Sequence, residues 1–100
     1  AARTAGRSPR AMLVPTLSDT LAASVGSGAR VFGVSGKDRS AVAMAGHVGK
    51  AFWYSTDTGD FQTSKYYYDE YPQWVTDWNA GRLAERYANK QWELLLEVTQ

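Results

Sequence analysis

A short charged stretch, Gly36-Lys37-Asp38-Arg39-Ser40, directly follows an apolar run that is typical of a buried strand. In open α/β sheets, ligands gather beyond the carboxyl ends of the strands, and a helix that begins there adds unpaired N–H groups and a partial positive charge. Lys37 and Arg39 are two residues apart, so on an extended link both side chains can point the same way. A guanidinium offers a planar fork and an ammonium a point charge. These residues therefore predict a site for a phosphoryl or sulfuryl oxyanion.

The same stretch has a plainer interpretation as a solvated, charged turn, because Lys-Asp-Arg alone is a weak motif. Asp38 fits both interpretations, since its carboxylate can orient a neighbouring cation or cap a following helix. The residues from Ser40 to Ala45 predict that helix, and Gly46 is expected to end it.

The other residues that could carry chemistry favour structural roles. His47 is the only histidine, and a catalytic zinc site usually needs three protein ligands. We therefore expect a buried, hydrogen-bonded, structural His47. Asp57 and Asp60 flank a glycine in a predicted turn, where Asp favours local backbone hydrogen bonds, and a calcium loop needs more ligands. The tyrosines at 66–68 can stack on bases or sugars, but with the net charge near zero we favour aromatic core.

The elements that would hold these residues alternate between helix and strand. Thr16, with Asp19 three residues later, resembles a capping box and predicts a packing helix that ends at Gly26. Residues 30–35 are apolar on both parities, which predicts a strand covered on both faces. The aromatic residues on either side of 57–60 predict a hairpin. Helical spacing follows Pro72, with Gly81 as a break. This order predicts an α/β protein.

The composition limits the classes of function. The chain has 100 residues, which is one domain at most, and a net charge of +1. This charge favours neither nucleic acid nor a membrane as a partner. There is no cysteine and no apolar stretch of the roughly 18 residues that a spanning helix needs. The chain starts without Met and ends on an apolar run, so we expect an internal piece of a longer polypeptide.

Residues 8 to about 95 resemble the single-chain bacterial alkaline phosphatases that are similar to nucleotide pyrophosphatase/phosphodiesterases, within the alkaline phosphatase superfamily. The order and spacing of several motifs carry the resemblance. They are Ser8-Pro9-Arg10, Lys37-Asp38-Arg39, Ala45-Gly46-His47, the aromatic strand 51–54, Thr63-Ser64 before Tyr66-Tyr67, and Trp74-Val75 before Trp78-Asn79.

The resemblance implies a larger enzyme, of which this chain supplies one part. Family members bind two zinc ions through Asp and His and use a Thr nucleophile, and none of these residues is matched here. Lys37 and Arg39 match the family's Lys and Arg that reach the non-bridging phosphoryl oxygens. Asp38 and His47 receive no role from the resemblance. It also implies a periplasmic or secreted location.

The sequence therefore predicts part of a zinc-dependent phosphomonoester hydrolase, with a phosphate ester as substrate and the rest of the parent polypeptide as partner. Residues 1–12 are expected to be a loop, and 13–100 an internal segment of a larger α/β sandwich domain. The 100-residue chain alone is expected to be inactive. Two alternatives stay open: a nucleotide pyrophosphatase/phosphodiesterase on the same scaffold, and a non-catalytic anion-binding or structural module.

Overall fold

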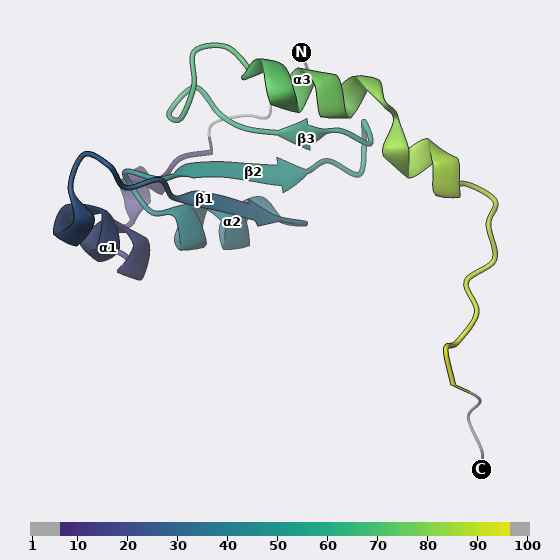
Figure 1. The fold of residues 1–100 in the computed structure, drawn as a ribbon, viewed down its shortest axis with the longest axis horizontal. Coiled ribbons are helices and arrows are strands. Elements are labelled where there is room, and N and C mark those ends of the chain that lie inside the picture. The colour runs from purple at the N-terminus through teal and green to yellow at the C-terminus, as the bar shows by residue number, and fades with distance from the viewer. Residues whose placement is uncertain (1–6, 97–100) are drawn as a thin grey trace.

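A computed structural model describes residues 7–96 and shows three strands with helices on both sides (Figure 1). No helix in that range is both long and apolar enough to cross a membrane. The elements in chain order are η1 (Pro9–Ala11), α1 (Leu17–Val25), β1 (Phe32–Ser35), α2 (Asp38–Ala45), β2 (Lys50–Tyr54), β3 (Phe61–Gln62), α3 (Gln73–Ala80) and η2 (Leu83–Tyr87), where η denotes a 3₁₀-helix.

The sheet has the order β1-β2-β3 and confirms the predicted α/β class. β1 and β2 are parallel and α2 connects them, whereas β2 and β3 are antiparallel and form the predicted hairpin. The parallel pair places the carboxyl ends of β1 and β2 at the same edge of the sheet. The connection from β1 to α2 begins at that edge, and the charged stretch 36–40 runs from this connection into the first turn of α2.

Small residues hold α2 close to the sheet. Gly33 on β1 faces the helix, and a Cβ atom built on it would lie 2.6 Å from the carbonyl oxygen of Ala41 and 3.0 Å from the Cβ of Ala45. Both alanines are fully buried and pack with Ala51 and Trp53 of β2 in one core cluster. Glycine and alanine at these positions let the helix backbone approach the strands.

The opposite face of the sheet carries larger side chains and is only partly covered. Phe52 is buried and meets the Trp74 ring of α3 with centroids 5.0 Å apart. On β1, Phe32 and Val34 remain 53% and 56% exposed. The expectation of a strand covered on both faces was therefore wrong for the described residues. Only the face of β1 that packs against α2 is fully covered. Apolar residues at both odd and even positions of the strand indicated that both faces favour burial. They did not indicate which element covers each face.

The first helix confirms the predicted cap and corrects the predicted packing. Thr16 accepts a hydrogen bond from the N–H of Asp19, and the Asp19 carboxylate accepts one from the N–H of Thr16. Gly26 ends the helix with φ 86°, a conformation that favours glycine. However, α1 has no buried residue among 17–25, and its apolar stripe, which includes Leu17 and Leu21, is exposed.

The end of the described chain is less helical than the sequence predicted. α3 forms after Pro72 and ends at Ala80, so the helix stops at the predicted break, although Gly81 itself keeps helical angles (φ −69°, ψ −13°). Residues Leu83–Tyr87 form a 3₁₀-helix and not an α-helix, after Arg82 adopts φ 47°. No helix follows between 88 and 96, where Trp92 and Leu95 are almost fully exposed. Helical spacing alone cannot sustain a helix that buries no face.

This pattern of exposure predicts that the isolated 100-residue chain self-associates. The exposed apolar side chains of α1, β1, α3 and the segment 92–96 exceed what a soluble monomer usually presents. The chain should bind the dye ANS and sediment as oligomers at micromolar concentration. A monomer that leaves ANS fluorescence unchanged and unfolds in one sharp thermal transition would contradict this expectation.

Candidate functional site

The two predicted site residues lie where β1 passes into α2. Lys37 is the N-cap of α2, with φ −129° and ψ 145°, and its side chain makes no capping hydrogen bond. Arg39 is the second residue of the helix, and both residues are exposed. The structure confirms that the charged stretch follows a strand and opens a helix. It corrects the reason for grouping the cations: α2 begins at Asp38, so they lie around the first helical turn and not along one extended link.

Asp38 is the carboxylate between these two cations, and it is paired elsewhere. The guanidinium Nε of Arg7 forms an ion pair with Asp38 Oδ2, joining the segment before η1 to the start of α2. The Asp38 side chain is 25% exposed and that of Arg7 is 51% exposed. Within residues 7–96, neither Lys37 nor Arg39 joins an ion pair or a side-chain hydrogen bond. Their charged groups are therefore available to a bound anion.

The start of α2 has the electrostatic character that suits an anion. A helix N-terminus carries unpaired N–H groups and a partial positive charge. Lys37 and Arg39 add two side-chain cations at the same turn, and Arg7 offsets the charge of the intervening carboxylate. This arrangement can hold the oxygens of a phosphoryl group by charge-assisted hydrogen bonds. Oxyanion binding at this turn stays a prediction.

His47 anchors the loop after α2 to the N-terminal part of the chain. Its Nδ1 lies 2.6 Å from Asp19 Oδ2 and its Nε2 lies 2.9 Å from the carbonyl oxygen of Met12. A carboxylate and a carbonyl are both acceptors, so both ring nitrogens must donate, which requires the imidazolium form. Asp19 Oδ1 also accepts hydrogen bonds from the backbone N–H groups of His47 and Val48. The predicted structural, hydrogen-bonded role of His47 is confirmed, with a half-buried rather than a buried side chain.

The hydrogen bonds between these groups shift both pKa values. The hydrogen bond to Asp19, and then that to the carbonyl of Met12, raises the pKa of His47 above 6.5. Burial alone would raise the pKa of Asp19, but the N–H of Thr16, the His47 ring and the N–H groups of Val48 and His47 outweigh it and hold that pKa well below 3.8. Both shifts favour the charged forms of the pair, the imidazolium of His47 and the carboxylate of Asp19.

The shifts predict how stability depends on pH. The pKa of His47 is higher in the folded chain, so its contribution is complete below about 6.5 and is lost as pH rises through the raised pKa. The pKa of Asp19 is lower in the folded chain, so its contribution is complete above about 3.8 and is lost as pH falls through the lowered pKa. Relative to wild type, His47→Gln should therefore be most destabilised at weakly acidic pH.

Thermal unfolding from pH 5 to pH 9 measures this difference, at protein concentrations below the onset of self-association. The midpoint difference between wild type and His47→Gln should shrink as pH rises. Because His47 is the only histidine, its ring protons also report its pKa directly by NMR. A pKa at or below 6.5, or a midpoint difference that does not change with pH, would contradict the paired imidazolium.

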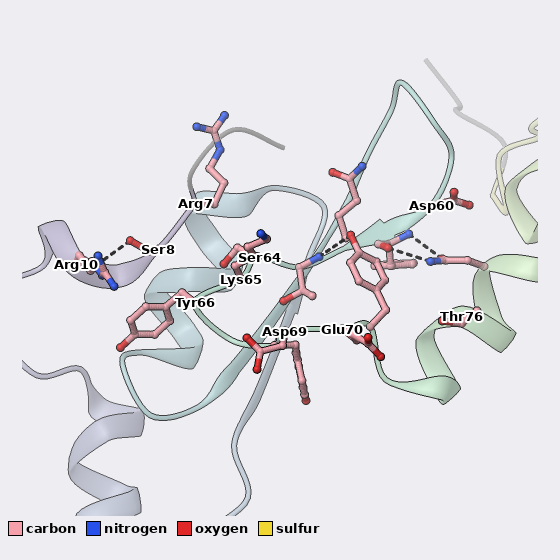
Figure 2. A pocket seen from close by; sticks show the side chains of 16 residues that line it. Arg7, Ser8, Arg10, Asp60, Ser64, Lys65, Tyr66, Asp69, Glu70 and Thr76 are labelled. Atoms are coloured by element: carbon pink, nitrogen blue, oxygen red, sulfur yellow. Dashed lines mark hydrogen bonds between the residues drawn. The ribbon is translucent and has the colours of Figure 1, made fainter. Parts of the chain in front are cut away.

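A cavity lies beside β3, and no residue of the charged stretch 36–40 lines it. Its volume is about 790 Å³, and Arg7, Ser8 and Arg10 lie on one side with Glu70 and Thr76 on the other (Figure 2). Lys37 and Arg39 do not line it. Its lining mixes three cations, Arg7, Arg10 and Lys65, with the carboxylates of Asp60, Asp69 and Glu70. This mixture gives no consistent charge for an oxyanion, so the start of α2 remains the better candidate.

The side chains next to β3 close its free edge. The amide of Asn79 on α3 bonds both the N–H and the carbonyl of Phe61, at 2.9 and 3.0 Å. The hydroxyl of Tyr71 accepts the N–H of Thr63 at 3.3 Å. Open strand edges invite pairing with other chains. These residues therefore have a structural reason to line the cavity.

Two of the remaining predicted assignments are also structural. Among the tyrosines at 66–68, which were predicted to be aromatic core, Tyr67 is buried and its hydroxyl donates to the carbonyl of Gly46. Burial raises its pKa to about 12, so the hydroxyl stays a donor. The prediction was wrong for Tyr66, which is 38% exposed. The Asp60 carboxylate pairs with Arg82 Nη1 at 2.8 Å and connects the hairpin turn to the start of η2, whereas the sequence predicted a hydrogen bond to the neighbouring backbone. In the described range 7–96, no group of three or more His, Asp, Glu or Cys residues could hold a metal ion.

Sequence reasoning missed two residues that organise the molecule. Asp19 was interpreted only as part of a helix cap, yet it also binds His47, which lies 28 positions away. Arg82 was not singled out, although it pairs with both Asp60 and Glu85. Neither partner choice has a local pattern in the sequence. The one available signal was that His47, the only histidine, needs hydrogen-bond acceptors, which the carboxylate of Asp19 can provide.

Comparison with solved structures shows which class of protein has this fold. The chain matches a crystal structure of wild-type alkaline phosphatase PafA with a TM-score of 0.81 and 39% identity, over 90% of this chain and 18% of that one. A PafA variant matches with the same TM-score and 37% identity. In that variant a threonine is replaced by serine, and an asparagine, a lysine and an arginine by alanine; one residue separates the lysine from the arginine.

Curated relatives give the same result at the level of sequence. Alkaline phosphatase PhoV of Synechococcus elongatus is 38% identical over 92 residues, and alkaline phosphatase PafA of Elizabethkingia meningoseptica is 38% identical over 94 residues. A protein of Myroides odoratus named calcium-transporting ATPase is 33% identical over 93 residues. The chain spans about 17% of the length of each relative. No family model matches the chain.

The chain is thus similar in sequence and in fold to a segment of the bacterial alkaline phosphatases. This confirms the resemblance that its motifs predicted.

Proposed function

We propose that this chain works as part of an alkaline phosphatase that hydrolyses phosphate monoesters, and that Lys37 and Arg39 bind the non-bridging oxygens of the transferred phosphoryl group. The observation that carries the proposal is the pair of cations at the first turn of α2, beyond the carboxyl end of β1, which make no ion pair with another residue in the described range 7–96. Preorganised cations stabilise the charge on these oxygens as the phosphoryl group is transferred. A periplasmic or secreted location belongs to the same proposal.

The PafA variant supports this assignment. Its substituted lysine and arginine have the same spacing as Lys37 and Arg39. Identity to this chain falls from 39% for wild-type PafA to 37% for the variant over 90% of the chain, roughly the loss of two matched residues. In the PafA variant, the substituted threonine and asparagine precede the lysine by more positions than this chain has before Lys37. If that lysine corresponds to Lys37, neither of them has a counterpart in this chain.

Zinc enters the proposal only through the family. When bound, the two zinc ions of such enzymes stabilise the attacking and leaving oxygens. The described residues contain no ligand set that fits a metal ion, so the roles proposed for this chain are confined to binding and orienting the phosphoryl oxygens. The 100-residue chain alone should then show no turnover, because its described residues provide neither a metal centre nor an activated nucleophile.

Hydrolysis of p-nitrophenyl phosphate tests the proposal. The complete enzyme is the polypeptide that contains both this chain and the segments corresponding to the remaining length of its relatives. It should release p-nitrophenol in the presence of zinc. The 100-residue chain should stay at background under the same conditions. A complete enzyme without phosphatase activity, or turnover by the 100-residue chain, would contradict the proposal.

A further inference from the structure

The ion pair between Arg7 and Asp38 has a consequence for the two candidate phosphate-binding cations. Asp38 is the residue between Lys37 and Arg39, and its carboxylate is only 25% exposed. A carboxylate in that position competes with phosphoryl oxygens for both neighbouring cations. Instead it pairs with Arg7, which reaches it from the segment before η1. Lys37 and Arg39 make no ion pair within residues 7–96.

We infer that Arg7 is a positioning residue for phosphate-ester hydrolysis: by pairing with Asp38 it keeps that carboxylate away from Lys37 and Arg39. The inference rests on the function proposed above. Arg7, Lys37 and Arg39 together with Asp38 carry a net charge of +2, and without Arg7 this net charge falls to +1. Arg7 itself acts through Asp38, and its guanidinium is not assigned a contact with the substrate.

The position of Asp38 gives its carboxylate a stabilising role of its own. It is the first residue of α2, where a negative side chain interacts favourably with the helix N-terminus. The same carboxylate weakens the positive potential that an incoming phosphate would meet. The ion pair with Arg7 offsets the charge of Asp38 while the carboxylate stays at the helix N-terminus.

A set of three variants of the complete enzyme tests the inference. Arg7→Gln should raise KM for p-nitrophenyl phosphate and lower kcat/KM about three- to tenfold, a modest effect because the pair is partly exposed. Asp38→Asn should not lower kcat/KM. The double variant Arg7→Gln/Asp38→Asn should return close to wild type, since removing both charges restores the net charge of +2.

Rescue by the second substitution separates this role from a structural one. If the ion pair only fastens the N-terminal segment, the double variant will be at least as impaired as Arg7→Gln. Arg10→Gln is the matched control: it removes the same charge three positions later, within η1, and Arg10 has no ion pair within 7–96. It should leave kcat/KM unchanged. The inhibition constant of inorganic phosphate should follow the same order as KM.

The outcomes distinguish this inference from the proposed function. If Lys37→Ala and Arg39→Ala lower activity but Arg7→Gln does not, the role of Arg7 is wrong while the function stands. An unrescued loss in Arg7→Gln, or an equal loss in Arg10→Gln, would also overturn the role of Arg7. If Lys37→Ala and Arg39→Ala leave activity unchanged, the proposed function fails and the inference fails with it.

Discussion

Replacing Arg39 or Lys37 by alanine in the complete enzyme should lower kcat/KM for a phosphate monoester by about 10² to 10³ each. A charge-assisted contact that strengthens as charge shifts in the transition state is worth about 3 to 4 kcal/mol in a preorganised site. The two side chains stand at the first turn of α2 with no competing ion pair within 7–96. Steady-state kinetics with p-nitrophenyl phosphate measures the loss.

Two further variants make this result specific. Arg39→Lys should recover only part of the activity, because the planar guanidinium fork is lost although the charge is kept. Lys65→Ala removes a cation that lines the cavity beside β3, which neither Lys37 nor Arg39 lines, and should be nearly neutral. If Lys65→Ala costs as much as Lys37→Ala, the effect comes from the overall charge of the protein and not from this site.

Gly33→Ala should destabilise the protein by about 2 to 3 kcal/mol and also impair activity. The added Cβ would lie 2.6 Å from the backbone carbonyl oxygen of Ala41 and 3.0 Å from the Cβ of Ala45. Backbone cannot move aside as a flexible side chain can, so α2 must shift from the sheet, at the cost typical of overpacked cores. That shift would carry Lys37 and Arg39 out of position. Thermal and denaturant unfolding of the complete enzyme measures the change in stability.

Gly36→Ala is the matched control for this variant. Gly36 lies in the same connection between β1 and α2, has no atom within 4 Å of an added Cβ and does not have a positive φ. An alanine there should leave stability unchanged or slightly higher, because glycine loses more conformational freedom on folding. Equal destabilisation by both variants would show that close helix packing is not the reason for Gly33.

Local signals in the sequence predicted the elements well. The capping box at Thr16 and Asp19, the strand before Lys37, the hairpin around Gly59 and the helix after Pro72 all depend on neighbours within a few residues, and all are present. Coverage of faces could not be predicted in the same way. The apolar face of α1 and the outer face of β1 lack a full cover in the described residues, and no periodic pattern states which element would provide it.

The candidate site was predictable in its residue types and less so in its geometry. Cations next to a predicted strand end indicated an anion site, and the resemblance assigned Lys37 and Arg39 to the phosphoryl oxygens. The helix starts at Asp38, two residues before the predicted Ser40, and this changed how the cations are grouped. The pairing of Asp38 with Arg7 joins positions 31 residues apart, and no local spacing rule predicts such a contact.

The most direct test of the central claim is the ratio of monoester to diester hydrolysis in the Lys37→Ala/Arg39→Ala double variant of the complete enzyme. If these cations hold the free phosphoryl oxygens, the monoester loses more than the diester, in which an ester group replaces one of those oxygens. The ratio of kcat/KM values for p-nitrophenyl phosphate and bis(p-nitrophenyl) phosphate should therefore fall by about tenfold or more, given the size of one charge-assisted contact. Equal losses for both substrates would show that the cations only support the fold. No loss with either substrate would show that Lys37 and Arg39 belong to a solvated, charged turn that does not bind the substrate.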